Sequence, residues 1–138
     1  MSPGRSAGRL IVTTTDEMEI ELFAGIPVSD YRRAVAWYER LLGGPPTFHA
    51  HSTECVWTLA DHRSIYVVLL PEHSGHAMVT FFPHDLDAFV AAAAAAGISA
   101  TDREDYGNGV RKIIYRDPDG NEIGVGGGPQ QVMERSAD

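Results

Sequence analysis

Apolar residues recur at helical spacing in residues 31–42, where Tyr31 is followed by further apolar side chains at i+3, i+4 and i+7. This spacing places them on one face of a helix. Ser29 or Asp30 precedes the helix as an N-cap, and the run Gly43-Gly44-Pro45-Pro46 ends it. The pattern therefore predicts a helix with one buried face.

A second helix is predicted from Asp85 through the alanine-rich segment to Gly97. Asp85 lies 55 residues after Asp30, and Gly97 lies 54 residues after Gly43. Such a constant offset between both helix starts and both helix ends indicates an internal repeat.

Strands are predicted where β-branched and aromatic residues cluster between turn residues. The first half gives strands at residues 21–28, 47–51, 54–59 and 64–70, and the second half at residues 76–82, 98–101, 110–115 and 122–125. The last two strands are joined by Asp117-Pro118-Asp119-Gly120-Asn121, a turn in which proline fixes one φ and glycine accepts a positive one. Each half is therefore a βαβββ unit.

One βαβββ unit cannot cover both faces of its own sheet. Two units can pair into a curved, partly closed mixed sheet around a cavity with helices outside, which is an α+β fold. Modules 21–71 and 76–126 then form one domain, residues 21–126. Residues 1–20 form an N-terminal extension, either a tail or an edge strand, and residues 127–138 form a C-terminal tail.

The formal net charge of −8 argues against nucleic acid and anionic membrane surfaces as partners. No apolar run is long enough to cross a membrane. Cys55 is the only cysteine, which agrees with a reducing cytoplasm, and we interpret it as buried and inert. The cations Arg111, Lys112 and Arg116 either face an anion at the cavity mouth or form a solvated edge.

Three motifs, in this order, resemble the vicinal oxygen chelate superfamily, which includes glyoxalase I, extradiol dioxygenases and bleomycin-binding proteins. Val28-Ser29-Asp30 followed by Ala36-Trp37-Tyr38-Glu39-Arg40-Leu41-Leu42-Gly43 resembles the first helix of that family. Asp85-Leu86-Asp87-Ala88-Phe89 resembles its second helix, and Asp117 to Asn121 its last hairpin. The resemblance covers roughly residues 20 to 126 and implies paired βαβββ modules, a glyoxalase-like fold and a homodimer.

Enzymes of this superfamily hold a divalent metal through His, Gln or Glu side chains on the first, fourth, fifth and eighth strands. Carried over to this chain, the four positions are Phe23, Val68, Met78 and Gly124. None of these side chains offers the nitrogen or oxygen donor that such a cation prefers. The resemblance therefore implies a cavity with apolar walls and no metal cofactor.

A displaced metal site is the alternative that we keep open. Glu21, His76 and Glu122 each lie two residues before one of the vacated positions, so they share strand faces with them. With these ligands the protein would be a metal-dependent lyase, isomerase or dioxygenase. Without a metal, Glu122 or His76 in an apolar pocket would offer acid–base catalysis instead.

Aromatic residues on neighbouring strands complete the candidate ligand site. Trp57, Tyr66 and Tyr115 face either the cavity, where a ring would stack on a planar or cationic ligand, or the helices, according to strand register. The predicted ligand-binding residues are Phe23, Trp57, Tyr66, Val68, Met78, Thr80, Tyr115 and Gly124. The sequence thus predicts a cytoplasmic, metal-free homodimer that binds a small apolar or aromatic molecule.

Overall fold

The structure is a computed structural model that describes residues 19–128. Most of the expected N-terminal extension and C-terminal tail lies outside these residues. None of the helices in the described part is long and apolar enough to cross a membrane. The elements are β1 (Leu22–Val28), α2 (Tyr31–Leu42), β2 (Phe48–His51), β3 (Glu54–Ala60), β4 (Arg63–Leu69), η2 (Pro71–His73), β5 (Met78–Phe81), α3 (Leu86–Ala95), β6 (Asp102–Gly107), β7 (Val110–Arg116) and β8 (Glu122–Gly127).

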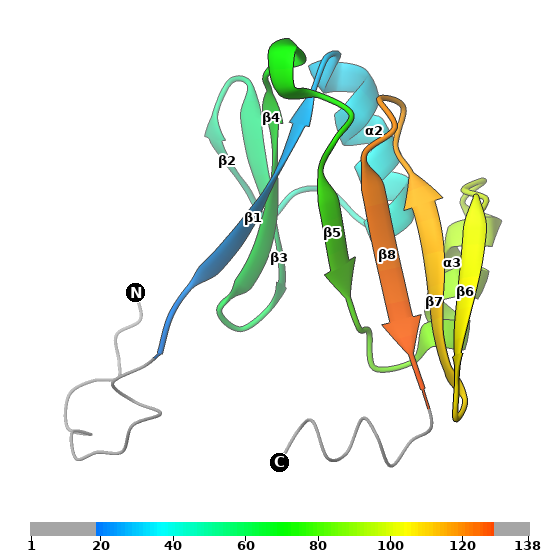
Figure 1. Ribbon diagram of the computed structural model, residues 1–138. Helices are drawn as coiled ribbons and strands as arrows, with labels where there is room; N and C mark the ends of the chain where they lie inside the picture. Colours follow the sequence, from blue (N-terminus) through cyan, green and yellow to red (C-terminus); the bar gives the residue numbers. More distant parts are fainter. Residues whose placement is uncertain (1–18, 129–138) are drawn as a thin grey trace, which may run out of the picture.

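The strands form two mixed sheets of four strands each, in the orders β1-β4-β3-β2 and β5-β8-β7-β6. The pairs β1–β4 and β5–β8 are parallel, and all other neighbours are antiparallel. The predicted α+β fold with two βαβββ modules is therefore confirmed. The first sheet (β1 to β4) and the second sheet (β5 to β8) stay separate and do not close, and their edge strands β1 and β5 face each other (Figure 1).

Both helices begin and end as their capping residues predict. The Asp30 carboxylate accepts a hydrogen bond from the Arg33 amide at 3.1 Å, and the Asp85 carboxylate accepts one from the Ala88 amide at 3.0 Å. Glycine in the left-handed conformation follows each helix, at Gly43 with φ 86° and at Gly97 with φ 87°.

The strand predicted at residues 98–101 is wrong: the first strand after α3 is β6, which begins at Asp102. Ile98 instead completes the C-terminal cap, because its amide donates to the Ala93 carbonyl at 2.9 Å and its side chain is buried beside the helix. β6 was missed because its sequence, DREDYG, is polar on both faces, as is common for an edge strand.

The two faces of each sheet have different roles. Alternate residues such as Ile26 and Val67 in the first sheet, and Ile123 and Val125 in the second, join the helices in one hydrophobic core. We call this side the helix face. The residues between them, among them Phe23 on β1, point to the opposite side, which we call the open face.

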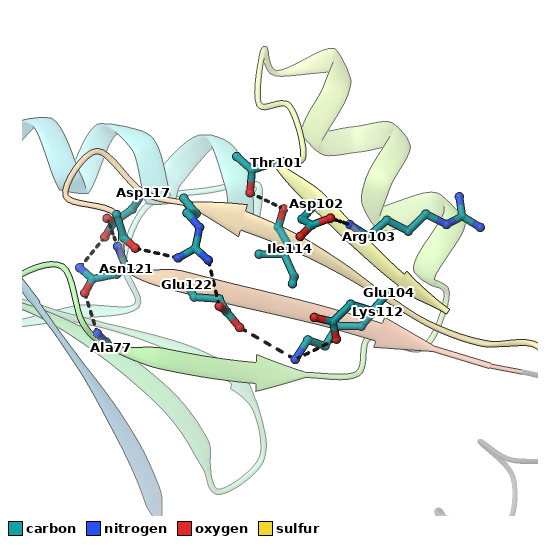
Figure 2. A network of polar contacts seen from close by, with 12 residues as sticks. Ala77, Thr101, Asp102, Arg103, Glu104, Lys112, Ile114, Asp117, Asn121 and Glu122 are labelled. Atoms are coloured by element: carbon teal, nitrogen blue, oxygen red, sulfur yellow. Dashed lines mark hydrogen bonds and ion pairs between the residues drawn. The ribbon is translucent and has the colours of Figure 1, made fainter. Parts of the chain in front are cut away.

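A buried polar joint connects the modules. The Asn121 side chain, fully buried, accepts hydrogen bonds from the amides of Gly75 and Ala77 at 3.0 and 2.9 Å, and donates to the Pro27 carbonyl at 2.8 Å (Figure 2). It also donates to the Asp117 carboxylate at 2.9 Å. The joint therefore ties the end of β1 to the segment that enters β5.

Tyr38 of α2 reaches the same joint, because its hydroxyl donates to the Asp117 carboxylate at 2.7 Å. Burial, and then the neighbouring Asp117 charge, raise the pKa of Tyr38 far above its ordinary value. Replacing Tyr38 with Phe leaves this buried carboxylate without one donor. We expect Tyr38→Phe to lower the free energy of unfolding by about 2 kcal/mol, measured by urea denaturation.

Tyr115→Phe is the matched control for that substitution. The Tyr115 ring is 1% exposed, as buried as that of Tyr38, but no hydrogen bond to its hydroxyl is found within the described residues. Its removal should cost less than about 1 kcal/mol. Equal losses in the two variants would show that the Asp117 contact does not stabilise the joint.

The start of β1 is fixed by the β3–β4 turn. The Leu22 amide donates to the His62 carbonyl at 2.9 Å, and the His62 ring contacts the carboxylates of Glu19, at 2.6 Å, and Glu21. The hydrogen bond to Glu21 is the largest cause that raises the pKa of His62. Because the folded state binds this proton more tightly, the contact stabilises the protein below the ordinary histidine pKa of about 6.5, and the stabilisation is lost as pH rises through the raised value.

We therefore expect an NMR titration of the His62 ring to give a pKa above that ordinary value. Glu21→Gln should lower it, because the amide carries no charge to favour the imidazolium. Glu72→Gln, on η2, is the control and should leave the His62 titration unchanged. A His62 pKa that is the same in wild type and Glu21→Gln would contradict the assignment.

Candidate functional site

Phe23 and Met78 lie on the open faces of the first and second sheets and are 46% and 73% exposed. Phe23 is the second residue of β1, and Met78 is the first residue of β5. β1 and β5 run in opposite directions, so their starts lie at opposite ends of the molecule (Figure 1). Within one chain these two residues do not line a common space.

Strand register corrects one of the four positions carried over from the resemblance. Gly124 pairs with Thr80, two residues after Met78. In the first sheet, the residue two positions after Phe23 is Gly25, and Gly25 pairs with Tyr66. The position on β4 that corresponds to Gly124 is therefore Tyr66. Val68 lies on the same open face, two residues further along.

Trp57 and Tyr115 lie on the helix faces, where both rings are almost fully buried. The Trp57 ring stands 6.0 Å from that of Tyr38, and its indole N–H donates to the Gly44 carbonyl at 3.0 Å. Tyr115 packs edge-on against Phe89 of α3 at 6.3 Å. Neither ring offers free surface on the open faces, so any effect of theirs on a ligand is indirect.

A cleft of about 550 Å³ lies between the edge strands β1 and β5. Both modules and both helices contribute to its lining, and sequence reasoning had placed only Thr80 of these residues in the site. Phe89 and Leu42 come from the helices, whose periodicity marks them as buried but says nothing of a cleft. The lining residues are Leu22, Ala24, Leu42, Leu59, Ala60, Arg63, Ser64, Ile65, Val79, Thr80, Phe81, Phe82, Pro83 and Phe89.

The cleft connects with the open face of each sheet. Ser64 lines the cleft and pairs with Phe23, while Thr80 lines it and pairs with Gly124. Phe82 also lines it, and its ring lies against Gly126 on the open face. The open-face positions Phe23 and Gly124 thus border the mouth of the cleft, one on each side.

A charged cluster occupies the open face of the second sheet beside Gly124. The Lys112 ammonium lies 3.9 Å from a carboxylate oxygen of Glu104 and 3.9 Å from one of Glu122 (Figure 2). Arg116 binds the other oxygen of Glu122 at 3.2 Å. The Tyr106 hydroxyl donates to Glu104. Both carboxylates therefore have donors other than Lys112.

The residues present do not fit a metal at either proposed place. At the carried-over positions, the Tyr66 hydroxyl is the only oxygen among the side chains, and one phenol is a poor site for a divalent cation. Of the displaced set, Glu21 contacts His62 at the start of β1, whereas His76 precedes β5 and Glu122 begins β8, at the other end (Figure 1). Across residues 19–128, no three His, Cys, Asp or Glu side chains are grouped to hold an ion.

Cys55 lies on the helix face of β3 and is fully buried. Burial is the largest cause that raises the pKa of its thiol. A raised pKa keeps the thiol protonated, and a protonated thiol is a poor nucleophile. Cys55 is therefore a core residue in this geometry.

Comparison with solved structures gives a close relative. A glyoxalase / bleomycin resistance protein from Catenulispora acidiphila is 51% identical, covers 80% of this chain and 99% of its own, and superimposes with a TM-score of 0.78. Two further structures share the fold at lower identity. They are the bleomycin resistance determinant encoded on transposon Tn5 (21% identical, covering 78% of this chain and 96% of its own, TM-score 0.62) and an antibiotic binding protein from Streptomyces sp. CB03234 (24%, 80% and 95%, 0.60).

No protein with a curated description matches the sequence. The profile of one family matches residues 19–125, nearly all of the described part. Together with the duplicated βαβββ modules, this match shows that the chain belongs to the Glyoxalase/Bleomycin resistance protein/Dioxygenase superfamily.

Proposed function

We propose that this protein binds a small apolar or aromatic molecule, without a metal, in the cleft between β1 and β5. The observation that carries the proposal is the cleft itself, about 550 Å³ in volume and lined mainly by apolar side chains from both modules. This volume lies within the range of small-molecule sites, roughly 300–1,000 Å³. The one cysteine of the chain agrees with a role in the reducing cytoplasm.

The chemistry of the walls favours a ring-containing ligand. Phe81, Phe82 and Phe89 offer three aromatic surfaces, and Arg63, Ser64 and Thr80 are the polar groups that would orient the ligand. Phe23 and Gly124 border the mouth of the cleft, and Tyr66, Val68 and Met78 lie further along the open faces of the two sheets. An antibiotic binding protein shares the fold, but our proposal rests on these side chains.

The same surface supports a homodimer. Phe23, Met78, Phe82 and Tyr106 are all about half exposed or more, on or beside the open faces. Large apolar side chains left in water on both open faces favour burial against a second molecule. A second copy that places the open face of its second sheet on the first sheet would bring its Met78 towards Phe23, which one chain alone keeps apart. The partner would then complete the walls of the site.

Binding can be tested with N-phenyl-1-naphthylamine, a neutral aromatic probe that fluoresces in apolar surroundings. We expect saturable binding by the wild type, unchanged by EDTA. Ala24→Trp, which fills the cleft, should weaken binding at least about tenfold because the probe loses its apolar contacts. At 100 times its dissociation constant, the probe should also stabilise the wild type by about 2.7 kcal/mol.

Ala88→Trp is the matched control, because Ala88 is an exposed residue of α3 outside the cleft. It should bind the probe like the wild type. Ala24→Leu, a smaller change, covers the case in which the tryptophan variant does not fold. Equal binding by all variants would exclude the cleft, and binding abolished by EDTA would favour the displaced-metal alternative.

The oligomer is tested by the mass in solution, measured by light scattering after size exclusion. We expect a dimer for the wild type and a monomer for Met78→Glu, because a charge would be buried at the proposed interface. Leu70→Glu, at the start of η2, is the control and should remain dimeric. A monomeric wild type would contradict the proposed dimer.

A further inference from the structure

We propose that Lys112 determines the specificity of this site by selecting aromatic ligands that carry an anionic group. This inference rests on the proposed function and names the ligand class. A carboxylate or sulfonate on the ligand would accept a hydrogen bond from the Lys112 ammonium, while the ring lies in the cleft.

The path of the Lys112 side chain places it beside the cleft. A Cβ atom built on Gly124 would stand 3.1 and 3.2 Å from Cε and Cδ of Lys112, and 2.8 Å from the hydroxyl of Thr80. Lys112 and Thr80 therefore overlie the same glycine, and Thr80 lines the cleft. A larger residue at position 124 would crowd the Thr80 hydroxyl and push the lysine stem outwards by a few tenths of an ångström.

The Lys112 ammonium is held in place but keeps donors to spare. The side chain is only 19% exposed, so most of it is withdrawn from water. Its two carboxylate neighbours both stand at 3.9 Å, beyond the length of a direct hydrogen bond. Among the described residues, no acceptor lies within hydrogen-bond distance of this ammonium. An ammonium whose N–H groups make no hydrogen bond, on a mostly buried side chain, favours a charged acceptor.

The charge of the cleft also favours an anion. Its lining contains one charged side chain, Arg63, and no carboxylate, although the whole chain has a net charge of −8. Within residues 19–128, no ion pair of Arg63 with an acidic side chain is found. Arg63 therefore gives the lining a positive charge on the β4 side, and the Lys112 ammonium lies outside the lining on the open face of the second sheet, between Glu104 and Glu122. Acidic residues elsewhere on the surface would steer cations, but they do not line this space.

The experiment compares two probes that share one ring system. 8-Anilino-1-naphthalenesulfonate carries a sulfonate, and N-phenyl-1-naphthylamine does not. We expect the wild type to bind the sulfonate about tenfold more tightly, the effect of one charge-assisted hydrogen bond at a partly exposed site. Lys112→Met, which keeps the apolar stem, should lose that tenfold for the sulfonate and bind the neutral probe within about twofold of the wild type.

Arg111→Met is the matched control. Arg111 is the neighbouring residue on β7, points to the helix face, and pairs with Asp87 at 3.1 Å. Arg111→Met removes the same charge from the same strand but on the opposite face. It should therefore leave the affinities for both probes unchanged. Equal weakening of sulfonate binding in both variants would mean that overall charge, not Lys112, determines affinity, and would overturn the inference.

Gly124→Ala gives a second variant, because its methyl group would crowd the Lys112 stem and the Thr80 hydroxyl while the charge remains. Sulfonate binding should weaken more than binding of the neutral probe. Equal affinity of the wild type for both probes would overturn the role of Lys112 and leave the proposed function standing. Failure to bind either probe would contradict the proposed function, and this inference with it.

Discussion

The buried amide of Asn121 is the contact on which the arrangement of the two modules depends. It satisfies the amides of Gly75 and Ala77 before β5 and the carbonyl of Pro27 in β1, and Asp117 fixes its orientation. The Asn121 side chain is fully buried and the three backbone groups are partly buried, so the loss of these hydrogen bonds would leave polar groups unsatisfied at about 1 kcal/mol or more each. The amide therefore holds the end of β1 and the start of β5 together, in a chain whose two sheets share no strand pairing.

The position of this joint, at one end of β1 and β5, explains why the cleft exists. β1 and β5 meet where Asn121 ties them, and they diverge towards the start of β1 and the end of β5 (Figure 1). The helices cover only one side of the gap, so Leu42 and Phe89 form part of its lining, and the strand edges form its sides. Hydrogen bonds at the joint and the packed core hold the walls of the cleft.

The sequence predicts the fold well because its signals are local and repeated: two N-caps, two C-terminal glycines and a turn with a fixed proline. It predicts the site less well. Trp57 and Tyr115 were assigned to the ligand, and the structure places them in the core, because which face a strand residue takes depends on register. The resemblance places the fourth-strand position near Val68, whereas the pairing of β1 with β4 places it at Tyr66, two residues earlier on the same face. Phe89 could not have been assigned, since a helix periodicity shows burial but not what the buried face borders.

Glycine stands at position 124, where the resemblance implies a metal-binding glutamate, and it affects more than metal binding. A glutamate there would add a negative charge beside Glu122 and take the space through which the Lys112 stem passes. With glycine at position 124, the Lys112 stem crosses β8. Its positive charge then lies near the place that the resemblance gives to a metal-binding side chain. Glu122 does not neutralise this charge fully, because Arg116 binds it more closely, at 3.2 Å against 3.9 Å for Lys112. Glycine at position 124 therefore allows the Lys112 stem to lie over β8 and its ammonium to stand beside Glu122, on the open face next to the cleft.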